Sequence, residues 1–275
     1  MANTPGLSQR VAIITGGGRG IGRAMALGLA KAGARVIVTA AREKLEIEAV
    51  AHEAEAECDE ARVTPLVADV VRDDNCARAV EFALARFGRL DILVNNAGRG
   101  MKYVSETFMT EPTRFWEASP AAYRLVIDTN VNGPFLMARV AAPTMIGAGW
   151  GRIVNISMNH ETMRRRGFSP YGPSKAALES ETIIWSQDLA GTGVTVNALL
   201  PGGATLTGMI PSGVPEDLRA KLLDPAIVVP LLLWLVSRDA DAFNGRRLVA
   251  TRWRADLGGA EAAAAASDEA GWRPT

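Results

Sequence analysis

The chain has 275 residues, of which 48% are hydrophobic and 22% are charged, with 27 glycines and two cysteines. This composition excludes a disordered, collagen-like or coiled-coil chain and a small disulfide-stapled scaffold. Thirty Lys and Arg residues balance thirty Asp and Glu residues, so the formal charge gives no reason to expect nucleic-acid or anionic-membrane binding, and the partner is expected to be a small molecule.

Short β-branched segments alternate with segments whose apolar residues recur at helical spacing. The predicted strands are residues 10–15, 34–39, 61–68, 90–94, 151–157, 193–200 and 247–250. The predicted helices are residues 21–32, 42–58, 75–87, 121–142, 174–190 and 227–237. This alternation predicts an α/β fold, a single doubly wound parallel sheet with right-handed crossovers and helices on both faces.

Two segments interrupt this alternation, residues 99–120 and residues 201–224. Long connections at the carboxyl edge of a parallel sheet commonly carry function, so both are predicted to form walls around a substrate. No linker divides residues 1–254, which are expected to form one dinucleotide-binding domain with its substrate loops. Residues 255–275 form an Ala-rich C-terminal tail, interpreted as an oligomer contact or a frayed end in preference to a surface helix.

The cysteines and the N-terminus indicate where the protein is expected to work. Cys58 and Cys76 lie in predicted helices, with neither a disulfide framework nor a metal-ligand spacing, so no metal site is predicted. Residues 1–9 lack the apolar core of a signal peptide, and the apolar run 227–236 is too short to span a membrane. A cytoplasmic protein without membrane contact is expected.

A glycine-rich turn lies between the first predicted strand and the first predicted helix, over residues 15–22. Backbone N–H groups and the positive end of a helix dipole can receive a pyrophosphate there. Glycines are needed because a Cβ would obstruct the phosphate or the packing of the helix on the strand. The candidate cofactor-binding residues of this turn are Thr15, Gly16, Gly18, Arg19, Gly20, Ile21 and Gly22.

Thr15, Gly16, Gly20 and Gly22 give the spacing Thr-Gly-x-x-x-Gly-x-Gly, and three further segments follow in order. These segments are Asn95-Asn-Ala-Gly98, Tyr171-Gly-Pro-Ser-Lys175 and Pro201-Gly202. In the order and spacing of these four motifs the chain resembles the short-chain dehydrogenase/reductase family over residues 8–250. The resemblance implies a Rossmann-type domain that binds NAD or NADP and transfers hydride between the nicotinamide and a carbonyl or secondary alcohol.

The resemblance also suggests a choice of cofactor. Relatives that prefer NAD commonly carry an acid at the end of the second strand, where this chain has Ala40. Arg19 and Arg42 can instead pair with a 2′-phosphate, so NADP is predicted, with NAD as the alternative. Further candidate cofactor-binding residues, implied by the family pattern, are Asp69, Val70, Asn96, Ala97, Gly98, Pro201, Gly202, Thr205 and Thr207.

Tyr171 and Lys175 are four residues apart at the start of a predicted helix, so they share one face. Carbonyl reduction needs a proton donor, and a nearby ammonium lowers the pKa of a phenol. By resemblance, Tyr171 is the general acid/base, and Lys175 lowers its pKa and also binds the nicotinamide ribose. The family also uses a proton-relaying Asn, assigned here to Asn130, with Asn132 as the alternative.

The chain departs from the family at the serine that polarises the substrate carbonyl, because Met158 occupies that position. A thioether cannot donate a hydrogen bond. Ser157 is the first substitute, although on a strand its side chain faces the other way unless the chain bulges; Asn159 and His160 are the others. The alternatives are that Tyr171 alone positions the carbonyl, or that the protein is a catalytically impaired NADP(H)-binding pseudoenzyme.

Apolar residues of both long connections predict a pocket for an apolar or mixed ketone or alcohol. Arg164, Arg165 and Arg166 offer either an attraction for an anionic group or a solvated charged surface. By resemblance, a homodimer or homotetramer is expected, with contacts through the helices that carry Asn130 and Tyr171.

Overall fold

The computed structural model describes residues 7–271. Residues 1–6, part of the segment for which no signal peptide is predicted, and residues 272–275 of the predicted tail lie outside the described chain. Within it, one sheet has the strand order β3-β2-β1-β4-β5-β6-β7-β8. Its strands are β1 (Val11–Thr15), β2 (Arg35–Ala40), β3 (Val63–Val67), β4 (Ile92–Asn95), β5 (Gly151–Ile156), β6 (Val194–Leu200), β7 (Arg246–Val249) and β8 (Ser267–Glu269).

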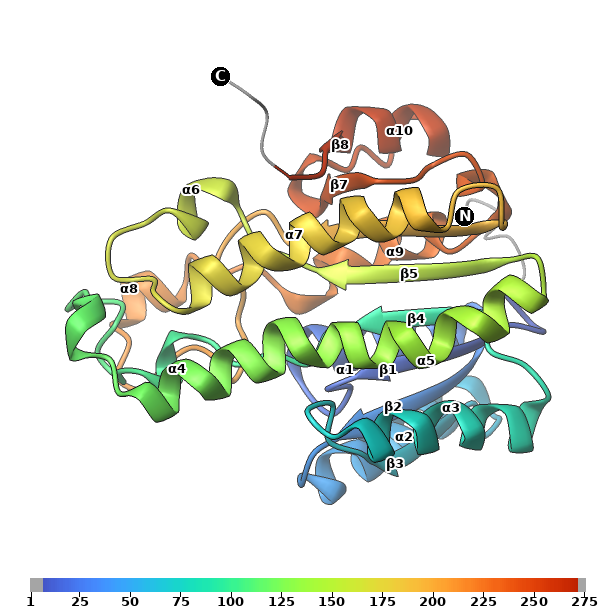
Figure 1. Cartoon of the computed structure of the whole chain (residues 1–275), viewed down its shortest axis with the longest axis horizontal. Coiled ribbons are helices and arrows are strands. Elements are labelled where there is room, and N and C mark those ends of the chain that lie inside the picture. The colour runs from blue at the N-terminus through green and yellow to red at the C-terminus, as the bar shows by residue number, and fades with distance from the viewer. Residues whose placement is uncertain (1–6, 272–275) are drawn as a thin grey trace.

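Helices cover both faces of this sheet (Figure 1). They are α1 (Gly20–Lys31), α2 (Lys44–Cys58), α3 (Asp73–Phe87), α4 (Pro120–Ile127), α5 (Gly133–Gly147), α6 (His160–Met163), α7 (Tyr171–Asp188), α8 (Glu216–Arg219), α9 (Val229–Leu235) and α10 (Gly259–Ala266). The first seven strands pair in parallel, so the predicted doubly wound, Rossmann-type architecture is confirmed.

Two apolar cores fill the space between the sheet and the helices on its two faces. One core includes Met25 of α1, Ile47 of α2 and Leu231 of α9, packed against one face of the sheet. The other includes Ala79 of α3 and Met137 of α5 against the opposite face. Strands β1 and β4 are buried along their whole length, which explains their nearly continuous apolar sequence.

The predicted helix over residues 121–142 is α4 and α5 joined by a π-helical turn at Asp128–Asn132. Ser119 starts α4 by accepting a hydrogen bond from the backbone N–H of Ala122 at 3.1 Å. A π turn adds a residue to the helical repeat and commonly occurs at functional sites. Here the turn carries Asn130, whose side chain is fully buried.

The interpretation of the Ala-rich tail as a frayed end is wrong for residues 259–271. Helix α10 buries Ala262, Ala263 and Ala266, because the small side chains allow it to lie close to the sheet. Strand β8 then pairs antiparallel with β7. This segment therefore extends the sheet and covers its edge, which the sequence pattern did not reveal.

The strands point their carboxyl ends toward α4, α6 and α8, which project beyond the sheet (Figure 1). The long connections therefore gather at this edge, as predicted, and both line a hollow that lies there. Across the described residues, no helix combines the length and the apolar character that a membrane span requires.

Candidate functional site

A cavity of about 600 Å³ extends along the carboxyl ends of the strands. One end is lined by the glycine-rich turn and by residues that follow β2 and β3. The other end is lined by Tyr171 and by the two long connections. The predicted cofactor residues and the predicted general acid thus share one space. Those in its wall are Gly16, Gly18, Arg19, Gly20, Ile21, Gly22, Asp69, Val70, Asn96, Ala97, Gly98, Tyr171, Lys175, Pro201, Gly202, Thr205 and Thr207.

The glycine-rich turn has the shape that a pyrophosphate requires. A Cβ on Gly22 would lie 2.3 Å from the carbonyl oxygen of Gly16, so this position accepts only glycine. Helix α1 starts at Gly20, and no side chain caps its first turn. The backbone N–H groups of that turn therefore remain available for an anion, and the site fits a dinucleotide.

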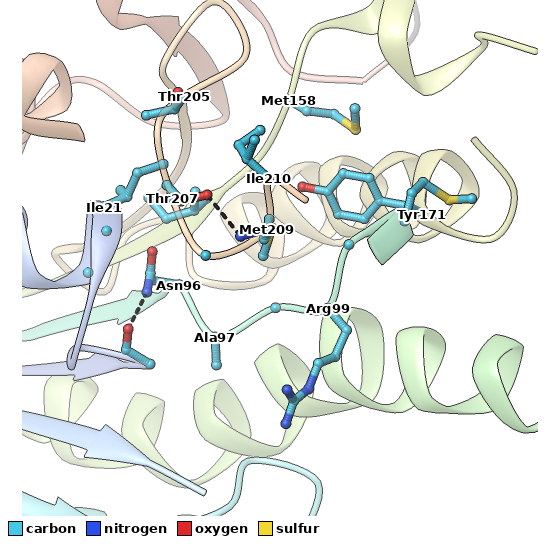
Figure 2. A pocket seen from close by; sticks show the side chains of 18 of the residues that line it. Ile21, Asn96, Ala97, Arg99, Met158, Tyr171, Thr205, Thr207, Met209 and Ile210 are labelled. Atoms are coloured by element: carbon cyan, nitrogen blue, oxygen red, sulfur yellow. Dashed lines mark hydrogen bonds between the residues drawn. The ribbon is translucent and has the colours of Figure 1, made fainter. Parts of the chain in front are cut away.

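Thr15 does not line the cavity but supports its floor. Its hydroxyl oxygen accepts hydrogen bonds from the backbone N–H groups of Asn96 and Ala97, each at 3.0 Å. The Asn96 side chain in turn donates to the carbonyl oxygens of Thr15 and Gly16 at 2.9 Å (Figure 2). These four bonds hold the end of β1 against the end of β4, so we assign Thr15 a structural contribution.

Charged residues of both signs line the cavity near the end of β2. Arg19 lies in the wall and its guanidinium is 3.1 Å from Glu46, whereas Arg42 is exposed and outside the wall. Glu43 and Glu46 also line the cavity, which the sequence analysis missed because it examined only Ala40. Burial disfavours ionisation of Glu43, but backbone hydrogen bonds and the charges of Arg19 and Arg99 outweigh it and lower the pKa of that carboxyl.

Tyr171 and Lys175 occupy the first turn of α7 and both line the cavity. The Lys175 ammonium donates to the carbonyl oxygen of Ile156 at 2.7 Å and lies 6.0 Å from the centre of the Tyr171 ring. Burial raises the pKa of the Tyr171 phenol to about 12, so the lowering expected from Lys175 is wrong for this structure. Burial lowers the pKa of Lys175 to about 8, against the opposing charge of Glu179.

Asn130 lies behind the cavity wall and connects two elements of the site. Its amide nitrogen donates to the carbonyl oxygen of Arg99 and to the hydroxyl of Ser174, both at 2.9 Å. Its amide oxygen accepts from the backbone N–H of Arg99 at 2.8 Å. Asn130 therefore fixes the chain after β4 against the start of α7, between Tyr171 and Lys175.

Ser157 lines the cavity, but its hydroxyl is bonded to a buried carboxylate. It donates to Glu179 at 2.7 Å, and Glu179 is only 1% exposed. The same carboxylate contacts His160 Nε2 at 2.9 Å and accepts from Arg247 Nε at 3.1 Å and from the backbone N–H of Gly271 at 3.3 Å. Glu179 therefore joins β5, α6, β7 and the chain after β8. The sequence analysis missed Glu179 because its partners are distant in sequence.

Met158 and Tyr171 both extend into the cavity (Figure 2). Ser157 is tied to Glu179, and Arg247 donates to the carbonyl oxygen of Met158 at 2.9 Å. The neighbouring Asn159 donates to the carbonyl oxygen of Gly202 at 2.9 Å. The structure thus places a thioether in the cavity and gives the side chains of Ser157, Asn159 and His160 other hydrogen-bond partners.

The segment after Pro201 and Gly202 separates its two threonines. Thr207 packs against the glycine-rich turn, because a Cβ on Gly20 would lie 3.0 Å from its methyl group. Its hydroxyl accepts from the backbone N–H of Met209 at 3.3 Å (Figure 2). Thr205 is 7% exposed and pairs as an isolated bridge with Leu223. Thr207 is therefore the better placed of the two to contact a cofactor.

Comparisons with known proteins agree with this geometry. Residues 10–216 match the family model of short chain dehydrogenases. A short-chain type dehydrogenase/reductase of Picea abies is 32% identical, over 87% of this chain and 90% of its own length. A 3-oxoacyl-[acyl-carrier-protein] reductase of Synechocystis sp. is 34% identical over 78% and 80%. A metagenomic short-chain oxidoreductase solved with NADP has a TM-score of 0.71 and 29% identity, covering 88% of this chain and 96% of that one.

Proposed function

The chain belongs to the short-chain dehydrogenase/reductase family, and from that premise we propose that it is an NADP(H)-dependent carbonyl reductase. The main observation in support is that Tyr171 and Lys175 line the same cavity as the glycine-rich turn. The reverse reaction is oxidation of a secondary alcohol. NAD(P) use follows from the family, whereas the preference for NADP and the roles below are our proposals.

In the proposed mechanism, the nicotinamide supplies hydride to the carbonyl carbon when it is bound. Tyr171 donates its phenolic proton to the carbonyl oxygen. The Lys175 ammonium stabilises the phenolate that results and binds the ribose. Asn130 acts as a positioning residue through Arg99 and Ser174.

The environment of Tyr171 supports reduction over oxidation at neutral pH. A phenol with a pKa of about 12 keeps its proton at pH 7, so it is ready as an acid and not as a base. Reduction is expected to proceed at neutral pH, while alcohol oxidation is expected to accelerate as the pH rises.

The second candidate function is cofactor binding without turnover. Met158 in the serine position favours it, together with the engagement of the Ser157 hydroxyl by Glu179. Loss of one oxyanion-type donor lowers a rate by about 10²- to 10³-fold without abolishing it. We therefore favour the reductase over the cofactor-binding protein, and we propose that Tyr171 alone positions the substrate carbonyl.

Steady-state oxidation of NADPH and NADH against a panel of aldehydes and ketones tests the proposal. Turnover of at least one carbonyl supports the reductase. Tight cofactor binding, measured by calorimetry, with no turnover across the panel would support the binding protein instead.

We expect a modest preference for NADPH, because Arg19 is already paired with Glu46. In Glu46→Gln, Arg19 is released to meet the 2′-phosphate, and the ratio of kcat/KM for NADPH over NADH is expected to rise about tenfold. Arg19→Ala should lower the same ratio. Glu48→Gln is the matched control, because Glu48 lies on α2 outside the cavity wall and pairs with Lys44. Equal ratios in all variants would contradict a 2′-phosphate contact by Arg19.

Glu179→Gln should change the pH profile of reduction. The charge of Glu179 raises the pKa of Lys175, whose value of about 8 already reflects that help. Without the charge, Lys175 loses its proton at lower pH, so the decline of kcat/KM with rising pH should begin at lower pH than in the unaltered protein. Glu161→Gln, an exposed carboxylate on α6, is the control. A lower Tm with an unchanged pH profile would leave Glu179 a purely structural role.

We also propose a homodimer or homotetramer in the cytoplasm. Exposed apolar side chains on α4, α5 and α7, among them Tyr123, Phe135 and Ile184, support the assembly. The free thiols Cys58 and Cys76 support a reducing compartment. Light scattering at several protein concentrations tests the assembly.

A further inference from the structure

A second hollow, of about 330 Å³, adjoins the substrate end of the main cavity. Arg165, Arg166 and Phe168 line both spaces, so the two lie side by side at these residues. The second hollow is completed by residues 113–116 of the first long connection and by Gly167 and Ser169. A ligand that passes Phe168 can therefore occupy both spaces.

Three guanidinium groups surround this second hollow, those of Arg114, Arg165 and Arg166. Over residues 7–271, none of the three has a carboxylate ion-pair partner, and two lie over aromatic rings instead. Arg114 lies over Trp116 at 5.5 Å, and Arg165 lies over Phe168 at 5.7 Å. All three arginines are exposed, and three positive charges around one hollow favour an anion there.

The positions of the neutral polar and acidic groups also favour an anion in the second hollow. The Thr113 hydroxyl oxygen, in a residue of the second hollow, is buried and has no hydrogen-bond partner in the described chain. Acidic residues line only the opposite end of the main cavity, at Glu43, Glu46 and Asp69. The lining of the second hollow therefore has positive charge and a spare hydroxyl but no carboxylate; the nearby Glu117 carboxylate accepts from the backbone N–H of Arg114 at 3.3 Å.

The turn that carries the two arginines is held firmly in place. Gly167 has φ +84°, and a Cβ there would lie 2.7 Å from the Pro112 side chain, so the turn packs directly on the first long connection. Phe168 packs edge to face on Phe108 at 6.0 Å between ring centres. These contacts place apolar side chains between the arginines and the Tyr171 region of the cavity.

We propose that the second hollow binds an anionic group, a carboxylate or phosphate, at the far end of a substrate whose apolar body lies in the main cavity. This inference rests on the proposed function. It defines the substrate class as carbonyl compounds with an apolar chain and a remote anion. Guanidinium groups suit such anions because they donate paired hydrogen bonds.

Calorimetric binding of octanoate and of octanamide, its neutral analogue, tests the inference without requiring turnover. The unaltered protein is expected to bind octanoate about tenfold more tightly than octanamide. The difference should shrink as the salt concentration rises from about 50 mM to about 500 mM. It should disappear in the double variant Arg165→Ala/Arg166→Ala and fall in Thr113→Val, which keeps the charges.

Arg164→Ala is the matched control, because it removes one charge from the same run at a residue that lines neither hollow. Equal affinity for octanoate and octanamide in the unaltered protein would overturn the inference, as would a preference that survives in the double variant. If inorganic phosphate binds as tightly as octanoate and displaces it, the hollow takes free anions and the assignment to a substrate end is wrong.

The cofactor-oxidation assay tests the reductase independently of the calorimetric test of the second hollow. Carbonyl turnover without an octanoate preference would overturn only this inference. An octanoate preference without turnover of any carbonyl would overturn only the reductase.

Discussion

Tyr171→Phe is expected to lower kcat for carbonyl reduction by about 10³-fold, because it removes the proton donor and keeps the ring that packs in the cavity. KM for the cofactor should change little, since the glycine-rich turn is untouched. The measurement is kcat and KM for the best carbonyl of the panel, with the cofactor affinity measured by calorimetry.

Tyr103→Phe provides the control for this change. Tyr103 also lines the cavity, but its hydroxyl is hydrogen-bonded to Arg99, which points away from Tyr171 (Figure 2). Its loss should change kcat far less than the loss of the Tyr171 hydroxyl. Similar rates for Tyr171→Phe and the unaltered protein would remove Tyr171 from the chemistry.

Met158→Ser is expected to raise kcat/KM by about 10²-fold or more, because it restores a hydrogen-bond donor for the developing negative charge on the carbonyl oxygen. The side chain at this position extends into the cavity, while the hydroxyl of Ser157 is held by Glu179. Met158→Ala is the matched control, because it opens the same space without adding a donor.

The comparison of the two variants separates the alternatives. If the serine variant gains little over the unaltered protein and the unaltered protein turns over, another group already supplies the missing hydrogen bond. If only the serine variant is active, Met158 disables catalysis and the natural function is cofactor binding. If alanine and serine give the same gain, the effect comes from access to the cavity and not from a donor.

The sequence predicted the sheet and much of the cavity wall, because those features depend on local patterns. Strands β1 to β7 follow from apolar segments, and the turn before α1 follows from its glycines. The residues of this turn could be recognised from the sequence between β1 and α1 alone. Tyr171 and Lys175 share one helical face, but they were identified by the order of motifs that resembles the family and not by the local pattern alone.

The rest of the site depends on contacts between distant segments, which no local pattern reveals. Glu179 contacts Arg247, 68 residues away, and Gly271, 92 residues away. Strand β8 is a short polar segment that forms only because β7 offers an unpaired edge. The π turn at Asn130 has the sequence of an ordinary helix. In each case tertiary contacts outweigh the local preference.

Ser157 and Met158 both line the cavity, but the Ser157 hydroxyl is bonded to the buried Glu179 carboxylate. Asn155 is paired with Asn95 and bonded to Thr182, which fixes which side chains of β5 and its extension face the cavity. A shift of β5 by one residue would exchange the two faces. In the observed register a serine is already encoded at the cavity wall one position before Met158, and its buried hydrogen bond to Glu179 is what engages its hydroxyl.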